Sequence, residues 1–396
     1  MMRPLLALVV GGSLAANVSA SDYIESVGEE ITLGPAGGWV RLFPDKATGD
    51  WHFLWAAGGD YLLLPMSSDF QVDDFDRRSI AGRNDLVDHA ITACPSGGFL
   101  HVASAHNESA YAFRYDDDFN LLVSGTLEEG EPTRRHNDLP ILCTPTLDAT
   151  SFISSNHSGT WLSIITGNAT QSELIELPSD VPRTEGGSLR MEPGSDELMV
   201  LGRGNGGKTF EVAGLDVNYE VAWKKTISPL SDNSLRPYWP QALMRVKDHY
   251  LLAFMGRDES AGWSSDWGNV YLAVLDADFN HLETTQISQY SPPEGAQRPG
   301  LARKGNQLLI TVDRNVQPQL FEVRLNAEAF GIVDGEDTGV GWDTAAKWGD
   351  SGSPGGGEDA GEEGCSCSAQ VTDNRRVLWP IVLGGLLVFR RRVRKG

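Results

Sequence analysis

A repeat of about fifty residues constrains the fold of this chain more than any other feature. Its clearest copies are the segments 98–106, 249–257 and 306–314, each of which is a short apolar stretch that ends in a polar turn. Weaker copies begin at Asp50, Thr160 and Asp196. A fixed period of this length indicates structural units that bury their apolar faces by packing against one another.

Each copy is flanked by two further short strands. One follows the apolar stretch and ends in an acidic or Asn-containing corner, in the segments 61–70, 111–119, 210–219, 271–279 and 320–330. Another precedes it and starts near Trp39, His89, Leu139, Leu189, Pro240 and Pro299, at intervals of 50 to 59 residues. Three to four short strands per unit predict an all-β, six-bladed β-propeller of four-stranded blades. Seven blades, or two stacked β-sandwiches, remain as alternatives.

Two local features agree with a ring of blades. Residues 251–255 are apolar on both faces of the expected strand, as in a strand sandwiched between neighbouring sheets. The ends of the ring must also meet. We therefore expect residues 23–33 to pair as an outer strand with the last unit, 299–333, within a propeller domain that spans 21–333.

The N-terminal residues 1–20 have the features of a secretory signal peptide. Arg3 is basic, residues 5–14 are apolar, and Val18, Ser19 and Ala20 form a small-residue cleavage site. Cleavage is expected after Ala20, so the protein is predicted to be exported into an oxidising compartment.

The C-terminal residues form a linker and a possible anchor. Residues 334–364 are rich in Gly, Asp and Glu and poor in aliphatic side chains, which predicts a disordered tether. Cys365 and Cys367, an apolar run at 377–389 and a basic end at 390–395 follow. The run has 13 residues, fewer than the roughly 20 that a membrane-spanning helix needs, although flanking arginines and local thinning of the bilayer allow a short span.

Cysteines, a short hydrophobic helix and an arginine cluster behind an acidic linker resemble the MYXO-CTERM sorting signal, over about the last thirty residues. Trp379 and Pro380 depart from the Leu-rich helix of that family. The resemblance implies that Cys365 or Cys367 is processed by a sorting protease and that the protein is anchored at the cell surface of a bacterial envelope. A permanent tail anchor is the alternative, and a metal site at the two cysteines has no nearby ligands to complete it.

Charge and motifs exclude several classes of function. The chain has 54 acidic and 32 basic side chains, a net charge of −22, which argues against a nucleic-acid partner. Nucleophile-elbow, kinase, phosphate-loop and zinc-hydrolase motifs are absent from the sequence. We therefore assign no catalytic residue, metal ligand or cofactor. The Asp clusters at 116–118 and 276–278 invite a calcium hypothesis, but their place at strand corners favours turn capping.

Polar residues recur where the apolar strands end and where the inner strands begin, which lie on one face of a propeller. The candidate ligand-binding residues are His89, His106, Asn107, Arg203, Arg236, Trp239, Arg257, Asp258, Arg298 and Arg314. Arginines bind planar anions through two hydrogen bonds, and tryptophans such as Trp263 and Trp267 can stack on sugars. The alternative is that these polar residues only stabilise turns and that the arginines pair with acidic neighbours. The repetition of a cationic residue at one register favours a site.

Two body cysteines occupy similar registers in neighbouring units. Cys94 and Cys143 are therefore candidates for a disulfide, with buried free thiols as the alternative. The sequence as a whole predicts an exported propeller that binds a ligand, such as a glycan or a surface protein, without catalysis. A hydrolase or lyase that acts on extracellular polysaccharide through the same polar ring is the competing hypothesis.

Overall fold

The computed structural model describes residues 21–333, apart from the short segments 35–36, 46–47, 74–75, 95–96, 106–109, 127–140, 144–149, 157–158, 166–171, 192–196, 205–206, 233, 264–266 and 315–316. Several predictions from the sequence therefore lie outside the described residues: the signal peptide, the linker, Cys365, Cys367, the apolar run 377–389, and the candidate ligands His106 and Asn107. Within the described residues, none of the helices has the length and apolar character needed to cross a membrane.

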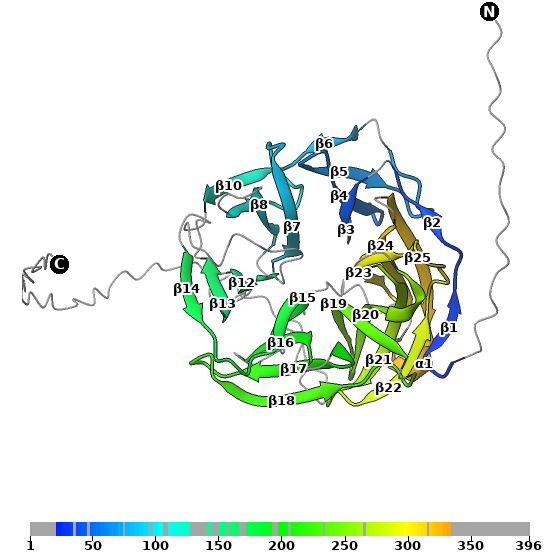
Figure 1. Ribbon diagram of the computed structural model, residues 1–396. Helices are drawn as coiled ribbons and strands as arrows, with labels where there is room; N and C mark the ends of the chain where they lie inside the picture. The colour runs from blue at the N-terminus through cyan, green and yellow to red at the C-terminus, as the bar shows by residue number, and fades with distance from the viewer. Residues whose placement is uncertain are drawn as a thin grey trace, which may run out of the picture. The chain divides into compact units, whose positions relative to one another are not determined.

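The described strands form six antiparallel sheets, which we number by the order of their innermost strands along the chain (Figure 1). The first sheet contains β3 (Gly38–Pro44), β4 (Trp51–Ala57), β5 (Asp60–Met66) and β6 (Arg78–Ser79). The second contains β7 (Leu86–Ala93), β8 (Phe99–Ala105), β9 (Ala110–Tyr115) and β10 (Leu121–Thr126). The third contains β11 (Ile141–Cys143), β12 (Thr150–Asn156), β13 (Gly159–Ile165) and β14 (Ser172–Glu176).

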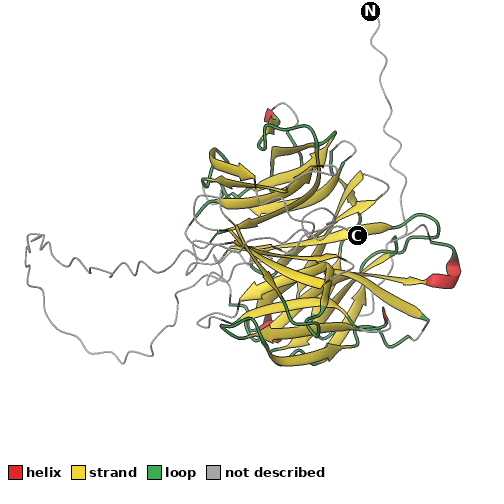
Figure 2. Cartoon of the chain, turned by 60° about the vertical axis from the view of Figure 1, so that its left-hand side comes forward, coloured by secondary structure: helices red, strands yellow, loops and turns green. Residues whose placement is uncertain are grey.

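The other three sheets repeat this order. The fourth contains β15 (Arg183–Met191), β16 (Leu198–Arg203), β17 (Phe210–Leu215) and β18 (Val221–Ile227). The fifth contains β19 (Leu235–Val246), β20 (His249–Asp258), β21 (Asn269–Asp276) and β22 (His281–Gln286). The sixth contains β23 (Ala296–Lys304), β24 (Gln307–Arg314), β25 (Gln317–Leu325), and the N-terminal strands β1 (Ile24–Val27) and β2 (Ile31–Thr32). Figure 2 shows how far strands and loops outweigh helices, which include η4 (Glu259–Ala261) and α1 (Ala327–Phe330).

The N-terminal strands close the assembly, as the sequence predicts. β1 pairs antiparallel with β25, with Ile24 opposite Leu325, and β2 pairs with the same strand, with Ile31 opposite Leu320. Residues from the two ends of the described chain therefore share one sheet, and no separate element is needed to join them.

Every sheet packs against the next through a distinct apolar cluster. In β20 the side chains alternate between two of these clusters: Leu251 and Ala253 pack toward the sixth sheet, whereas Leu252 packs toward the fourth. All three are 0% exposed, which confirms the prediction of a strand with two buried faces. Six such clusters lie between successive sheets, and the last joins the sixth sheet to the first.

This arrangement is a β-propeller. The innermost strands β3, β7, β11, β15, β19 and β23 contact one another in that order, and β23 contacts β3 again. Such a closed cycle does not fit two stacked β-sandwiches, because each sheet here has both faces covered by different neighbours.

The acidic corners cap turns. Asp116 accepts hydrogen bonds from the backbone N–H groups of Asp118 and Asn120, and Asp276 does the same for Asp278 and Asn280. The residue before each Asn adopts a left-handed conformation, for example Phe279 at φ 62°. The turn-capping interpretation of the Asp clusters is thereby confirmed.

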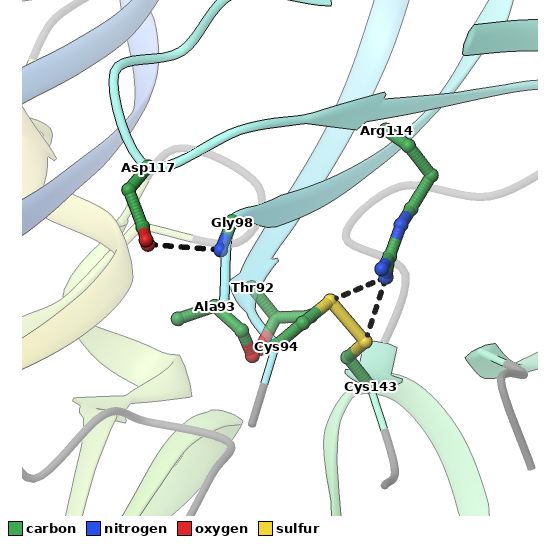
Figure 3. The surroundings of a disulfide bond; sticks show 7 residues. All are labelled: Thr92, Ala93, Cys94, Gly98, Arg114, Asp117 and Cys143. Carbon is green, nitrogen blue, oxygen red and sulfur yellow. Dashed lines mark hydrogen bonds between the residues drawn. A yellow bond between two sulfur atoms is a disulfide. The ribbon is translucent and has the colours of Figure 1, made fainter. Parts of the chain in front are cut away.

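Cys94 and Cys143 form a disulfide that joins the second and third sheets, with a Cα–Cα distance of 5.0 Å (Figure 3). Cys94 follows β7 and Cys143 ends β11, so the bond links two innermost strands. Arg114 Nη1 lies 2.7 Å from the sulfur of Cys94 and 3.1 Å from that of Cys143. The predicted disulfide is confirmed.

Four innermost strands begin earlier than the sequence suggests, β7 and β23 by three residues, β19 by five and β15 by six. β15 and β19 extend to Arg183 and Leu235 because each contains a bulge, between Arg183 and Ser188 and between Tyr238 and Ala242. Bulges of this kind interrupt the alternation by which a strand is recognised, and they redirect side chains at the edge of a sheet. In β19 the bulge separates Tyr238 from the regular part of the strand, and Tyr238 becomes part of the candidate site.

Candidate functional site

One end of the sheets carries most of the candidate residues. In the fifth sheet Arg236, near the start of β19, pairs with Arg257, near the end of β20. In the fourth and sixth sheets Arg203 and Arg314 pair in the same way with the starts of β15 and β23. The predicted equivalence of Arg203, Arg257 and Arg314 is therefore correct.

The structure brings three of these arginines around one aromatic ring. The Arg203 and Arg257 guanidinium carbons lie 4.4 and 4.2 Å from the centre of the Tyr238 ring. Arg236 lies close by, because the guanidinium groups of Arg203 and Arg236 both approach Gly207. A Cβ atom at Gly207 would lie 3.4 Å from Arg203 Nη2 and 3.7 Å from Arg236 Nη1. We call Arg203, Arg236, Tyr238, Arg257 and Glu259 the arginine–tyrosine cluster.

Glu259 is the carboxylate of this cluster. Its Oε2 lies 2.9 Å from Arg236 Nε, and its Oε1 accepts a hydrogen bond from the Tyr238 hydroxyl. The side chains of Arg236 and Glu259 are 38% and 40% exposed, so this ion pair lies at the solvent side of the cluster. Tyr238 itself is 6% exposed.

Arg203 and Arg257 differ from Arg236 in their partners. Nε and Nη1 of Arg257 are buried and have no hydrogen-bond acceptor among the described residues. The Arg203 side chain has no hydrogen bond or ion pair with the described residues, and its contact with Tyr238 is a cation–π interaction. Two guanidinium groups with unused donors therefore share one ring.

Asp258, another candidate ligand-binding residue, caps a short helix. Its carboxylate accepts hydrogen bonds from the backbone N–H and the hydroxyl of Ser260, at 2.9 and 2.7 Å, and caps the short helix η4. The hydrogen bonds from Ser260 lower the pKa of this carboxyl group. The neighbouring Glu259, not Asp258, contacts the arginines.

Arg314 lies outside the cluster, in the sixth sheet, and has ion pairs of its own. Its guanidinium contacts Glu30 at 2.9 Å and Glu294 at 3.3 Å, and it lies 4.6 Å from the centre of the Tyr290 ring. Glu30 lies between β1 and β2, so this pair helps to hold the N-terminal strands to the sixth sheet. Arg314 therefore has carboxylate partners, whereas Arg203 and Arg257, at the equivalent positions of the fourth and fifth sheets, have guanidinium donors without an acceptor in the described part of the chain.

Arg298 and His89 lie in a second network, around Trp39. Arg298 stacks 4.2 Å from the Trp39 ring and contacts Asp313 at 3.5 Å. Asp313 also accepts a hydrogen bond from the Trp39 backbone N–H, and Trp39 packs edge-on against His89. This network connects the sixth, first and second sheets. Sequence reasoning identified two of its members but missed Trp39 and Asp313, because only the closed ring brings them together.

His89 is buried in this network and was wrongly expected to face a ligand. It is 2% exposed, stacks on Tyr61 and shares a hydrogen bond between its Nδ1 and His101 Nε2 at 3.0 Å. Burial lowers the pKa of His89 to about 3 and also lowers that of His101. Both rings are therefore neutral in the folded protein at neutral pH.

The predicted aromatic residues are only partly placed. Trp239 lies within the bulge of β19, although its side chain is outside the described atoms. The Trp263 ring lies against Gly295, so close that a Cβ atom at Gly295 would be 2.9 Å from the ring. The residue that organises the described arginines is a tyrosine, Tyr238.

No protein-family model matches the sequence, and no curated protein matches it. Among solved structures, a member of the DUF4221 family from Bacteroides vulgatus is 10% identical with a TM-score of 0.49, over 76% of this chain and 97% of that chain. Kuenenia stuttgartiensis hydrazine synthase is 12% identical with a TM-score of 0.43, over 78% of each chain. A subtype N10 neuraminidase-like protein of A/little yellow-shouldered bat/Guatemala is 8% identical with a TM-score of 0.47, over 78% of this chain and 99% of that chain. Likenesses at this level assign no ligand or activity to this protein.

Proposed function

We propose that this protein is an exported, surface-anchored propeller of six blades, one blade per sheet, which binds an anionic ligand at the arginine–tyrosine cluster. The observation that carries the proposal is the pair of guanidinium groups on Tyr238. Arg257 presents two buried donors without an acceptor, and Arg203 presents further donors beside the same ring.

The buried Arg257 donors lack an acceptor among the described residues, in a chain that is rich in carboxylates. Acidic side chains outnumber basic ones by 54 to 32, so a carboxylate partner is readily available for each arginine. A buried donor without an acceptor costs about 1–3 kcal/mol of folding free energy. An anionic ligand would supply the missing acceptors, and the free energy recovered would contribute to its affinity.

The composition of the cluster supports binding over catalysis. Its described members include one carboxylate, Glu259, which is already bound by Arg236 and Tyr238, and no histidine. Hydrolysis or elimination needs an acid and a base that can exchange protons with the substrate. His89, which the competing hydrolase hypothesis would use, is buried against Tyr61 and His101.

The cellular setting of this proposal comes from the sequence. We propose that the signal peptide directs export and that the C-terminal segment anchors the protein at the cell surface after processing at Cys365 or Cys367. The disulfide between Cys94 and Cys143 is in keeping with an oxidising compartment. The anionic ligand would then be a component of the surroundings of the cell, such as an acidic glycan or a surface protein.

Calorimetric titration of the full chain tests the proposal. The titrants are inorganic phosphate, sulfate and tri-galacturonate, a trisaccharide with three carboxylates. We expect at least one of them to bind, and Arg203→Ala or Arg257→Ala to weaken its binding at least tenfold, because a hydrogen bond to a charged group contributes about 1.5–3 kcal/mol.

Arg314→Ala is the matched control for this titration. Arg314 occupies the equivalent register in the sixth sheet, but Glu30 and Glu294 already neutralise it. Its removal should leave the affinity unchanged. Absence of binding by every anion, or equal binding by the wild type and the Arg203 and Arg257 variants, would refute the proposed function.

A further inference from the structure

Glu259 occupies part of the arginine–tyrosine cluster in the way that a ligand would. Its two carboxylate oxygens bridge Arg236 Nε and the Tyr238 hydroxyl. A planar anion with two oxygens therefore fits between these donors. We infer that Glu259 is an internal competitor for the ligand, and that the ligand presents a carboxylate that replaces it. This inference rests on the proposed function, since it concerns the same site.

The position of Glu259 allows it to leave the cluster. It begins η4, a helix of three residues in which no side chain is buried. Both members of its ion pair are more than one third exposed, and exposed ion pairs contribute little to stability. Solvent can therefore replace the arginine at small cost when the Glu259 side chain turns away.

The backbone around Glu259 stays in place during such a movement. Asp258 caps the turn through Ser260, and Gly262 ends it in a left-handed conformation at φ 78°. These contacts do not involve the Glu259 side chain. Displacement thus needs a change of side-chain rotamer and no rearrangement of the loop, which makes Glu259 a removable cover for the site.

Displacement would also change the number of arginines that a ligand meets. With Glu259 in place, Arg203 and Arg257 provide the free donors, whereas Arg236 and the Tyr238 hydroxyl are occupied. A ligand carboxylate that replaces Glu259 gains those two donors and removes a like charge from its surroundings. Glu259 would thereby select ligands that bind more strongly than it does and would lower the affinity for all others.

The test compares Glu259→Gln with the wild-type full chain in calorimetric titrations with tri-galacturonate. The glutamine keeps the size of the side chain and removes its charge, so we expect the affinity to rise about fivefold or more. Fully methyl-esterified tri-galacturonate, which lacks carboxylates, should not gain affinity. Glu294→Gln is the control, because Glu294 pairs with Arg314 at the equivalent register and should not affect binding.

The outcomes separate this inference from the proposed function. Wild-type binding that requires Arg257, with no gain or a loss in Glu259→Gln, would overturn the inference and leave the proposed function standing. An equal gain for the carboxylate and its ester would also overturn it. Binding of tri-galacturonate by Glu259→Gln alone, with phosphate or sulfate still bound by the wild type through Arg257, would support the inference. Absence of binding of tri-galacturonate, phosphate and sulfate by both proteins would remove both proposals.

Discussion

At the scale of single residues, His89 and His101 form a buried titratable pair, of which the sequence predicted a ligand-binding role for His89. His89 and His101 share a hydrogen bond, and both rings stack on Tyr61. His101 is 0% exposed, and Tyr115 lies 3.4 Å from its other ring nitrogen. A hydrogen-bonded pair of this kind requires at least one neutral ring, and burial keeps both neutral. Their role is therefore in folding.

The pair predicts a loss of stability in acid. In the unfolded chain a histidine has a pKa near 6.5, whereas burial lowers that of His89 to about 3 in the fold. Below pH 6.5 the unfolded chain thus binds protons that the folded chain cannot. For His89 the free energy of unfolding should fall by about 1.4 kcal/mol per pH unit, a loss of about 2 kcal/mol at pH 5, and the lowered pKa of His101 acts in the same direction.

Guanidinium chloride denaturation at pH 7.5, 6 and 5 measures this effect. His89→Phe should be less stable than the wild type at pH 7.5, because it loses the hydrogen bond to His101, but its stability should decline less steeply with falling pH. His281→Gln changes an exposed histidine and should keep most of the wild-type dependence. An identical pH dependence in His89→Phe and the wild type would contradict the assignment.

Single residues were predictable from the sequence where their contacts are local. Asp116 and Asp276 cap turns two and four residues ahead, so their role follows from spacing alone. His89 and Arg298 lie at the predicted register, yet their partners come from other sheets. No local pattern distinguishes an arginine beside Tyr238 from one that pairs with Glu30, which is why the site was only partly predicted.

At the level of elements, the N-terminal strand β1 is the piece that joins the two ends of the ring. Ile24 is 2% exposed and packs in the cluster between the fifth and sixth sheets, where Tyr23 also contacts Phe330. Glu25, the next residue, is exposed. The strand therefore stabilises the last sheet through one of its faces.

Ile24→Ala should destabilise the protein by about 2–5 kcal/mol, the usual range for removing a buried isoleucine side chain. Glu25→Ala, on the opposite face of the same strand, should have an effect below about 0.5 kcal/mol. Thermal and denaturant unfolding of the two variants gives the comparison. Similar stabilities of Ile24→Ala and Glu25→Ala would show that β1 is not part of the cooperative structure.

Most elements followed from the sequence because each unit repeats the same pattern of apolar strands and polar turns. The pairing of residues 23–33 with the last sheet followed from the need to close a ring. The starts of β15 and β19 could not be predicted from the sequence, because bulges interrupt the alternation of side chains between the two faces of the strand. The bulge in β19 adjoins Tyr238, so the least predictable stretch of strand is also the one that forms the candidate site.

At the level of the whole molecule, the ring brings together residues that lie far apart in the sequence. Arg203 belongs to the fourth sheet, whereas Tyr238 and Arg257 belong to the fifth, and the cluster exists only where these two sheets adjoin. This junction between sheets thus holds two guanidinium groups, those of Arg203 and Arg257, without a carboxylate partner among the described residues. The function proposed for this protein requires an anion to bind there.

A crystal structure of the full chain with tri-galacturonate would show whether an anion binds at the cluster. We predict a carboxylate of the ligand within hydrogen-bond distance of Arg203 and Arg257, and the Glu259 side chain turned away from Arg236. A ligand bound elsewhere on the propeller, with Glu259 still on Arg236 and the Arg257 donors still without an acceptor, would contradict it.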